Sequence, residues 1–562
     1  MKRVTVALIA IATAGCGGEA TLVDGGAEGD ADVDAAEAPA VIATAPGDQS
    51  VGASPDGVVA ATFSRAMDAS SLDATTFVVT TPAGPLAGPV TYDGDTHTAT
   101  FTPELRAPLL AEVTATVTTG ATAADGVALA ADHTWSFAVR DGVWADAGRI
   151  DADDGGNGYT PRVAVAPDGG AVAVWTETSS PAVWASRCPA GGGWTAAERI
   201  DGDADYSGVV DVAVDDAGDA MVVWTVASPG VPAQLWARRS VAGSGWEPAE
   251  MLDGNAGTAA LASDGAGNAA VVYQHSPGSG WDLWGRRFVP GQGWGPALPL
   301  ETGTGVAGQE RVAIDDAGAV TAVWVQADAA PLTALAGHSP YLWTTAPASV
   351  WAARYLPGVG LSAAELLEQN TSTAAFPRID ASGDGRAVVT WVETSAAGKH
   401  ILANRRAPDA GWTGAVQLDA AGGELGSPDA AIAPAGDAIA AWTLLDGSRN
   451  DVWTTRFDGA TWSPPVLLET DDSGTAFDPR VGLDAAGHGL ALWYQSDGVG
   501  YTARSARLVA GAGWAAPEIR DDTAVAGEGF EPQIAVGSSG VAAAAWWRDD
   551  GGPHQVWAST YR

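Results

Sequence analysis

Arginine recurs at one position of a pattern that runs through most of the 562-residue sequence. In each copy a glycine is followed six residues later by an aromatic residue. The position at which arginine recurs lies seven residues before that glycine. Guanidinium groups bind oxyanions through directed hydrogen bonds, so arginines gathered at one place suit an anionic or polyhydroxylated ligand. The alternative is that they form ion pairs with acids elsewhere in the repeat. The eight positions hold Arg162, Asp211, Ala260, Arg311, Arg378, Asp429, Arg480 and Gln533.

Acidic residues recur at a second position, just after the last β run of each copy: Asp151, Asp201, Asp253, Glu301, Glu368, Asp419, Glu469 and Asp521. One interpretation is a cation site or an attraction for a basic partner. Recurrence in every copy favours the other interpretation, in which each carboxylate caps the same turn. Asp201, Asp203 and Asp205 alternate as in calcium-binding loops, but Tyr206 stands where such a loop needs glycine. The sequence therefore matches a calcium-binding loop only in part, and no other cofactor is expected.

The elements that must position these residues are short β runs. The glycine and aromatic pairs are Gly169/Trp175, Gly218/Trp224, Gly267/Tyr273, Gly318/Trp324, Gly385/Trp391, Gly436/Trp442, Gly487/Trp493 and Gly540/Trp546. Each unit contains four β runs, which is typical of a propeller blade. A lone fourth run at 147–150 precedes the first unit, and the last unit ends after its third run. The sequence therefore predicts an eight-bladed β-propeller over 143–562, closed by pairing its two ends in a way that resembles WD-repeat propellers.

One connection breaks the repeat. Most second and third strands are separated by a short link, but residues 327–349 form a much longer one that contains His338, Tyr341 and Trp343. Long loops in compact domains tend to be functional or disordered. We expect these aromatic residues to stack on a sugar ring beside Arg311 and Arg378, the alternative being that they only pin the loop to its own blade.

The N-terminus has the features of an export signal. Lys2 and Arg3 precede an apolar run from Val4 to Ala12, and Thr13-Ala14-Gly15-Cys16 resembles the lipobox of bacterial lipoproteins, apart from Thr13. The resemblance implies a signal peptide over 1–15 and lipidation of Cys16; the alternative is ordinary cleavage and a free Cys16. Residues 16–39 are acidic and lack apolar periodicity, which predicts a disordered tether. We therefore expect an exported protein anchored to the outer membrane or cell surface, the alternative being a periplasmic or secreted one.

Residues 40–140 show alternating β runs separated by Gly, Pro and Asp turns, which predicts a β-sandwich. The segments Phe63-Ser64-Arg65-Ala66-Met67-Asp68, Phe101-Thr102-Pro103 and Trp135-Ser136-Phe137 resemble the bacterial Ig-like domain of exported proteins. That resemblance implies a spacer or adhesive module without catalytic residues. Met67 is then a core residue and Asp68 a turn residue.

Charge and motifs narrow the function. The net charge of −40 excludes nucleic acid as an ordinary partner, because phosphate neutralisation needs a basic face. The turns differ from the sialidase Asp-box in spacing, and no nucleophile or metal-ligand motif is present. We expect a binding protein for carbohydrate or a cell-surface polymer, in contact with membrane only through its lipid anchor. The alternatives are a sialidase-like or other propeller glycoside hydrolase and a structural scaffold of the envelope; the sequence carries no signal for oligomeric state.

Overall fold

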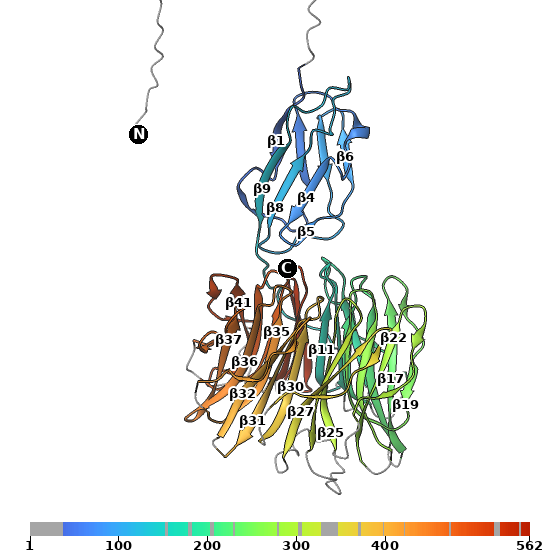
Figure 1. The fold of residues 1–562 in the computed structure, drawn as a ribbon, viewed down its shortest axis with the longest axis vertical. Coiled ribbons are helices and arrows are strands. Elements are labelled where there is room, and N and C mark those ends of the chain that lie inside the picture. The colour runs from blue at the N-terminus through green and yellow to red at the C-terminus, as the bar shows by residue number, and fades with distance from the viewer. Residues whose placement is uncertain are drawn as a thin grey trace, which may run out of the picture.

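The computed structural model describes residues 37–562 except for 152–155, 178–181, 203–206, 229–230, 278–279, 302–305, 328–346, 369–371, 397, 421, 471–473, 499, 522–528 and 550–551. The described residues form an N-terminal sandwich and a ring of eight sheets (Figure 1). They are nearly all β, with one short 3₁₀ turn, η1 (Ala69–Ser71). No helix in this part of the chain is long and apolar enough to cross a membrane. The predicted all-β class is confirmed, whereas the predicted signal peptide, most of the tether and Cys16 lie outside the described residues.

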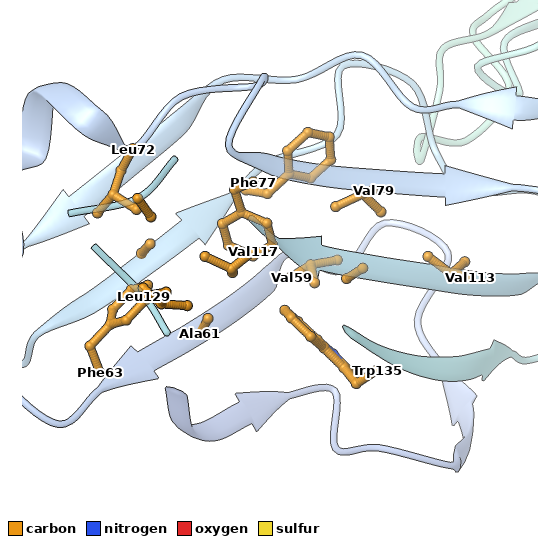
Figure 2. Packing of buried hydrophobic residues seen from close by; sticks show 14 of the residues in the cluster. Val59, Ala61, Phe63, Leu72, Phe77, Val79, Val113, Val117, Leu129 and Trp135 are labelled. Carbon is orange, nitrogen blue, oxygen red and sulfur yellow. The ribbon is translucent and has the colours of Figure 1, made fainter. Parts of the chain in front are cut away.

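The sandwich packs two sheets face to face. One has the order β1 (Val41–Ala45), β3 (Val59–Phe63), β7 (Thr98–Phe101), β6 (Val90–Asp93); the other has the order β2 (Ser50–Ala53), β9 (His133–Val139), β8 (Glu112–Val117), β4 (Phe77–Thr81), β5 (Gly84–Pro85). Alternate residues of the strands point inward, so Phe63, Phe77 and Trp135 meet in one core (Figure 2). As expected, Met67 is buried in this core and Asp68 caps η1, accepting a hydrogen bond from the amide of Ser70 at 2.9 Å.

Each of the eight sheets is a blade of antiparallel strands, and in blades 1 to 7 the strands follow the chain from the centre of the ring outward. The inner strands of blades 1 to 8 are β11 (Gly158–Val165), β15 (Ser207–Val214), β20 (Ala256–Ser263), β25 (Ala307–Ile314), β30 (Thr373–Ala381), β35 (Leu425–Ile432), β39 (Ala476–Leu483) and β44 (Gly529–Val536). The second strands are β12 (Ala171–Glu177), β16 (Ala220–Ser228), β21 (Ala269–His275), β26 (Val320–Ala327), β31 (Ala387–Ser395), β36 (Ala438–Asp446), β40 (Gly489–Ser496) and β45 (Ala542–Arg548).

The third strands are β13 (Ala182–Cys188), β17 (Val231–Val241), β22 (Asp282–Val289), β27 (Ala348–Leu356), β32 (Gly398–Ala407), β37 (Arg449–Phe457), β41 (Tyr501–Val509) and β46 (Gln555–Tyr561). The outer strands are short, and in five blades they break into two pieces that pair with the same third strand. They are β14 (Glu198–Arg199), β18 (Gly245–Trp246), β19 (Glu250–Asp253), β23 (Gly293–Trp294), β24 (Leu298–Pro299), β28 (Gly360–Leu361), β29 (Glu365–Leu366), β33 (Gly411–Trp412), β34 (Val416–Gln417), β38 (Val466–Leu467), β42 (Gly513–Trp514), β43 (Glu518–Ile519) and, for blade 8, β10 (Gly148–Arg149).

The ring closes as the count of β runs in the repeat predicts, by pairing of strands from its two ends. The outer strand of blade 8 is the early strand β10, in which Gly148 pairs with Ala558 and Arg149 with Trp557 of the last strand, β46. The inner strand of blade 1 also packs beside β44 and β45 of blade 8. The fold is therefore an eight-bladed propeller.

The second strands lie in the middle of their blades, and apolar side chains on them pack against the neighbouring blades. Their aromatic residue is fully buried in every blade, from Trp175 to Trp546, with Tyr273 in blade 3. Trp224, for example, packs in one cluster with Val174 of blade 1 and Val222 of blade 2. The repeated aromatic residues are thus structural. The repeated glycine is explained by the backbone: Gly169, for example, has φ +89° in the turn between the first two strands, a conformation that favours glycine.

The sandwich contacts the ring at the turns between first and second strands. The amide of Leu109 donates to the carbonyl of Ser539 at 2.9 Å, and the Leu109 side chain is buried in a cluster with Leu490, Ala542 and Tyr561. These residues belong to blades 7 and 8. We call the opposite side of the propeller, where second strands connect to third strands, the loop face.

Candidate functional site

The eight repeated positions on the inner strands are structurally equivalent. Each pairs with the residue that precedes the buried aromatic of the second strand, as Arg162 does with Val174 and Arg311 with Val323. Arg378 and Arg480 pair in the same register with Thr390 and Leu492. All eight therefore lie at one level around the centre of the ring. Ala260 is buried and the other seven are half-buried.

A bulge just before this level sets the direction of the side chains. In every blade the inner strand shifts register in the residues preceding the repeated position. In six blades the residue two places earlier is a non-glycine residue with positive φ, such as Thr160 at +48° and Gln309 at +55°. This conformation is costly for a residue with a side chain and is found where a strand must redirect its neighbours.

The four arginines share one geometry. In each of them Nη1 donates to the carbonyl of the preceding residue, at 2.9 Å for Arg162, 2.7 Å for Arg311, 3.0 Å for Arg480 and 3.5 Å for Arg378. A guanidinium has five N–H donors, so this hydrogen bond fixes the group and leaves other donors for a ligand.

The arginines come from blades 1, 4, 5 and 7, yet their charges act on one another. Burial and the charges of Arg311 and Arg480 hold the pKa of Arg378 well below its usual value, with Arg162 contributing in the same direction. Burial likewise lowers the pKa of Arg311, although Glu310 opposes the shift. We call Arg162, Arg311, Arg378 and Arg480 the arginine cluster. Like charges gathered in this way favour the binding of an anion.

The two aspartates at the same level are engaged with the backbone. Asp211 Oδ2 accepts from the amide of Leu261 at 2.9 Å, and Asp429 Oδ2 accepts from that of Val481 at 2.9 Å, so each carboxylate joins its inner strand to the next blade. Asp429 Oδ1 also lies 4.0 Å from Arg378 Nε. Within the described residues the other three arginines of the cluster have no acid within 4.0 Å. The alternative prediction is that these arginines form ion pairs with the acids that follow the outer strands. The described residues do not show such pairs.

Those outer acids cap the blades. Asp419 Oδ1 accepts from the amide of Ile401 at 2.8 Å, Glu469 Oε2 from Val452 at 2.6 Å and Asp521 Oδ1 from Ala503 at 2.9 Å, each donor lying on the third strand of the same blade. Others have an arginine partner, as Asp151 does in Arg149 at 2.6 Å. In these blades the carboxylate therefore serves a structural purpose, as that interpretation expects, although its partner is the third strand and not a turn.

An aromatic cluster that the sequence analysis missed lies at the loop-face ends of blades 8 and 1. Trp547 and His554 stack with ring centroids 4.4 Å apart and planes at 11°, and the Tyr159 ring meets both edge-on at 5.4 Å and 4.7 Å. Tyr159 stands three residues before Arg162 on β11. Trp547 is one of four tryptophans that the repeat does not explain. This exception is the sequence feature that could have indicated the cluster.

The remaining predicted site residues are only partly described. His338, Tyr341 and Trp343 lie outside the described residues, as do Asp203 and Asp205. Asp201 is described: its side chain is buried and its Oδ1 accepts from Arg199 Nε at 2.8 Å. Among the described residues no group of three or more potential ligands is placed to hold a metal ion.

Comparison with known proteins assigns the sandwich. Residues 35–139 match the family model described as a bacterial Ig-like domain, which confirms the resemblance read from the three motifs. No curated protein matches the chain.

Solved structures with similar folds are distant. A protein of unknown function from Dyadobacter fermentans is 11% identical, with 75% of this chain and 100% of that chain covered and a TM-score of 0.39. A polysaccharide lyase of the ulvan lyase family is 9% identical, with 64% and 92% covered and a TM-score of 0.42. A thermostable family-43 glycoside hydrolase is 10% identical, with 48% and 93% covered and a TM-score of 0.28. Likenesses this distant assign neither ligand nor chemistry.

Proposed function

We propose that the protein is an exported surface-binding protein whose propeller takes an acidic carbohydrate, or another anionic polymer of a cell surface, at the arginine cluster. The observation that carries this proposal is that four arginines from separate blades lie at one level of the ring, each with its guanidinium held by a backbone hydrogen bond. A chain with a net charge of −40 repels polyanions at long range. Cations concentrated at one level of such a chain therefore favour a ligand that binds at that level, through directed contacts rather than general attraction.

The Ig-like sandwich fits this role as a spacer. It contacts the ring through the turns at blades 7 and 8, and the aromatic cluster of Tyr159, Trp547 and His554 lies at the opposite ends of blades 8 and 1. A lipid anchor at Cys16 would then hold the loop face away from the membrane. The sequence Thr13-Ala14-Gly15-Cys16 supports the anchor. Metabolic labelling with an alkyne fatty acid tests it: the wild-type chain should be labelled, and equal labelling of Cys16→Ser would refute lipidation at this residue.

Binding is tested by titrating the full chain with polygalacturonate and, in parallel, with neutral dextran. The proposal expects polygalacturonate binding that weakens as salt is added, and little binding of dextran. The double substitution Arg311→Gln, Arg378→Gln should weaken polygalacturonate binding by about tenfold or more, because two charge-assisted contacts are lost.

The matched control is Arg386→Gln. Arg386 belongs to the same blade as Arg378 but lies at the turn between the first two strands, where it pairs with Asp384. Binding that survives in the double variant, or that falls equally in the control, would contradict the site. Release of new sugar ends during the titration would instead identify the hydrolase alternative, and a folded protein that binds no surface polymer would favour the scaffold alternative.

A further inference from the structure

A cavity of about 310 Å³ lies between the outer halves of blades 3 and 4, away from the arginine cluster. Its walls come from the second and third strands of both blades and from their short outer strands. Trp294, Leu298 and Leu300 line it from blade 3, and Val320 and Tyr355 from blade 4. A volume of this size is at the lower end for small-molecule sites.

Small residues open this cavity. Ala270 of blade 3 holds the place that Met221 holds in blade 2, since the two pair in the same register with Arg287 and Arg239. Ala353 of blade 4 holds the place of Asn404 in blade 5, whose Nδ2 donates to the carbonyl of Leu367 of the preceding blade at 3.0 Å. At these two positions the cavity walls are thus smaller than the corresponding residues of blades 2 and 5.

At three other blade boundaries an arginine of one blade lies over an aromatic ring of the next blade, and this contact does not form here. Arg239 lies over the ring of Phe288 at 5.7 Å between blades 2 and 3. Arg405 lies over Phe457 at 3.3 Å between blades 5 and 6, and Arg507 over Tyr561 at 5.2 Å between blades 7 and 8. The equivalent residues at the boundary of blades 3 and 4 are Arg287 and Tyr355; both line the cavity, and no such stacking joins them in the described structure.

Arg287 also lacks the acid that pairs with its counterparts in blades 2 and 6. Arg239 pairs with Asp219 of its own blade, and Arg456 Nη2 lies 2.7 Å from Asp437 Oδ1. Asn268 takes that place in blade 3, and its Nδ2 donates to Asp264 at 2.7 Å. Among the described residues Arg287 makes no ion pair, and its buried Nε has no hydrogen-bond partner.

We propose that this cavity binds a small amphiphile with an apolar body and one anionic head, such as a medium-chain carboxylate. The apolar body would fill the space between Trp294 and Tyr355, and the head would bind the guanidinium of Arg287. The lining favours a negatively charged head group, because the guanidinium of Arg287 lacks an ion pair in the described structure and Arg286, which also lines the cavity, adds a second positive charge. This site is independent of the arginine cluster and of any polymer bound there.

The test is calorimetric titration of the full chain with decanoate and with decanol. Decanoate should bind more tightly than decanol. Arg287→Gln should weaken decanoate binding by about tenfold while leaving decanol binding unchanged, because only the charged head loses a contact. The matched control is Arg456→Gln, an arginine at the same position of blade 6 that keeps its acid in the wild-type protein, and it should leave both affinities unchanged.

A second variant tests the cavity without removing charge. Ala270→Met copies the residue of blade 2 and should abolish binding of both compounds without lowering the melting temperature, since it fills existing space. Ala353→Asn, which copies blade 5, provides the same test if the first variant does not fold. Absence of decanoate binding, or binding that persists in the filled variant, would overturn the proposal.

Discussion

Arg507 of blade 7 holds both carboxylate oxygens of Asp141, with Nη2 3.0 Å from Oδ1 and Nε 3.3 Å from Oδ2. Asp141 lies in the short link between the sandwich and the propeller, so this paired contact ties the link to the ring. Paired hydrogen bonds of this kind restrict orientation as well as distance. The sandwich is therefore docked on the propeller in a defined position, and Leu109 is the apolar part of that docking.

Leu109→Ala should lower the free energy of unfolding by about 2 to 4 kcal/mol, because it empties a buried site between the two units. Leu109 is 1% exposed, whereas Leu105, in the same loop region, is 52% exposed. Leu105→Ala is therefore the control and should change stability by less than about 0.5 kcal/mol. Chemical denaturation measures both. Equal losses would show that Leu109 does not dock the sandwich.

Asp484 makes stability depend on pH. Burial raises its pKa to about 6, even though the amides of His488 and Ala486 donate to it. The folded state thus holds the proton more tightly than the unfolded state, and the stability from this group is present below about pH 4 and lost as pH rises through about 6. Asp484→Asn keeps the acceptor without the charge. Its stability relative to wild type should therefore rise between pH 4 and pH 8, by up to roughly 3 kcal/mol.

Asp315→Asn is the matched control for this titration. Asp315 occupies the same turn in blade 4, but Arg354 Nη2 lies 3.2 Å from its Oδ2. Removing that carboxylate leaves a half-buried guanidinium without its partner, so the variant should be less stable than wild type at pH 8. Denaturation curves for Asp484→Asn that run parallel to wild type at every pH would contradict the shifted titration.

Asp419 should matter for stability rather than for binding. It accepts hydrogen bonds from the amide of Ile401 at 2.8 Å and from His400 Nδ1 at 3.0 Å, and its side chain is 3% exposed. Asp419→Ala leaves a buried donor without an acceptor and should cost about 1 to 3 kcal/mol. Asp409→Ala, at an exposed turn of the same blade, should be near neutral. Unchanged polygalacturonate affinity in a destabilised Asp419→Ala protein would agree with the capping role; a selective loss of affinity would not.

Tyr159 should contribute to polymer binding through its ring. Trp547 and His554 hold that ring edge-on, three residues from Arg162. Tyr159→Ala should weaken polygalacturonate binding several-fold, because sugar rings pack on aromatic faces. Tyr159→Phe keeps the ring and should bind almost as wild type does. Titration of both variants decides the matter, and equal affinities for Tyr159→Ala and wild type would place the ligand elsewhere.

The repeat made most of the fold predictable. A glycine and an aromatic residue at fixed spacing located the second strand of every blade, because a left-handed turn and a fully buried position each restrict the residue type. Counting runs then predicted the pairing of β10 with β46. Equivalence of the inner positions followed from the same spacing.

The site was less predictable because its particular features are departures from the repeat. The hydrogen bond from Arg311 to the preceding carbonyl depends on a bulge in which Gln309 has a positive φ. Glutamine is not a residue type that predicts a positive φ, so the sequence does not indicate the bulge. The stacking of Trp547 on His554 joins two strands across a connection. The cavity beside Arg287 is lined by Ala270 and Ala353 from two different blades, and the pattern along a single strand does not predict which residues of two blades face one another.

The place of β46 has a consequence for how the protein is made. This strand follows β10 by more than 400 residues, yet it lies between β45 and β10, and Arg562 exchanges backbone hydrogen bonds with Val143 at 2.8 Å and 3.1 Å. Ribosomes add roughly 5–20 residues per second, so β10 waits tens of seconds for its partner to be synthesised. Until then the growing chain carries open sheet edges at both ends of the array, where association with other chains is easiest. Pairing of β46 with β10 removes those edges, so the array is protected from such association only late in its synthesis.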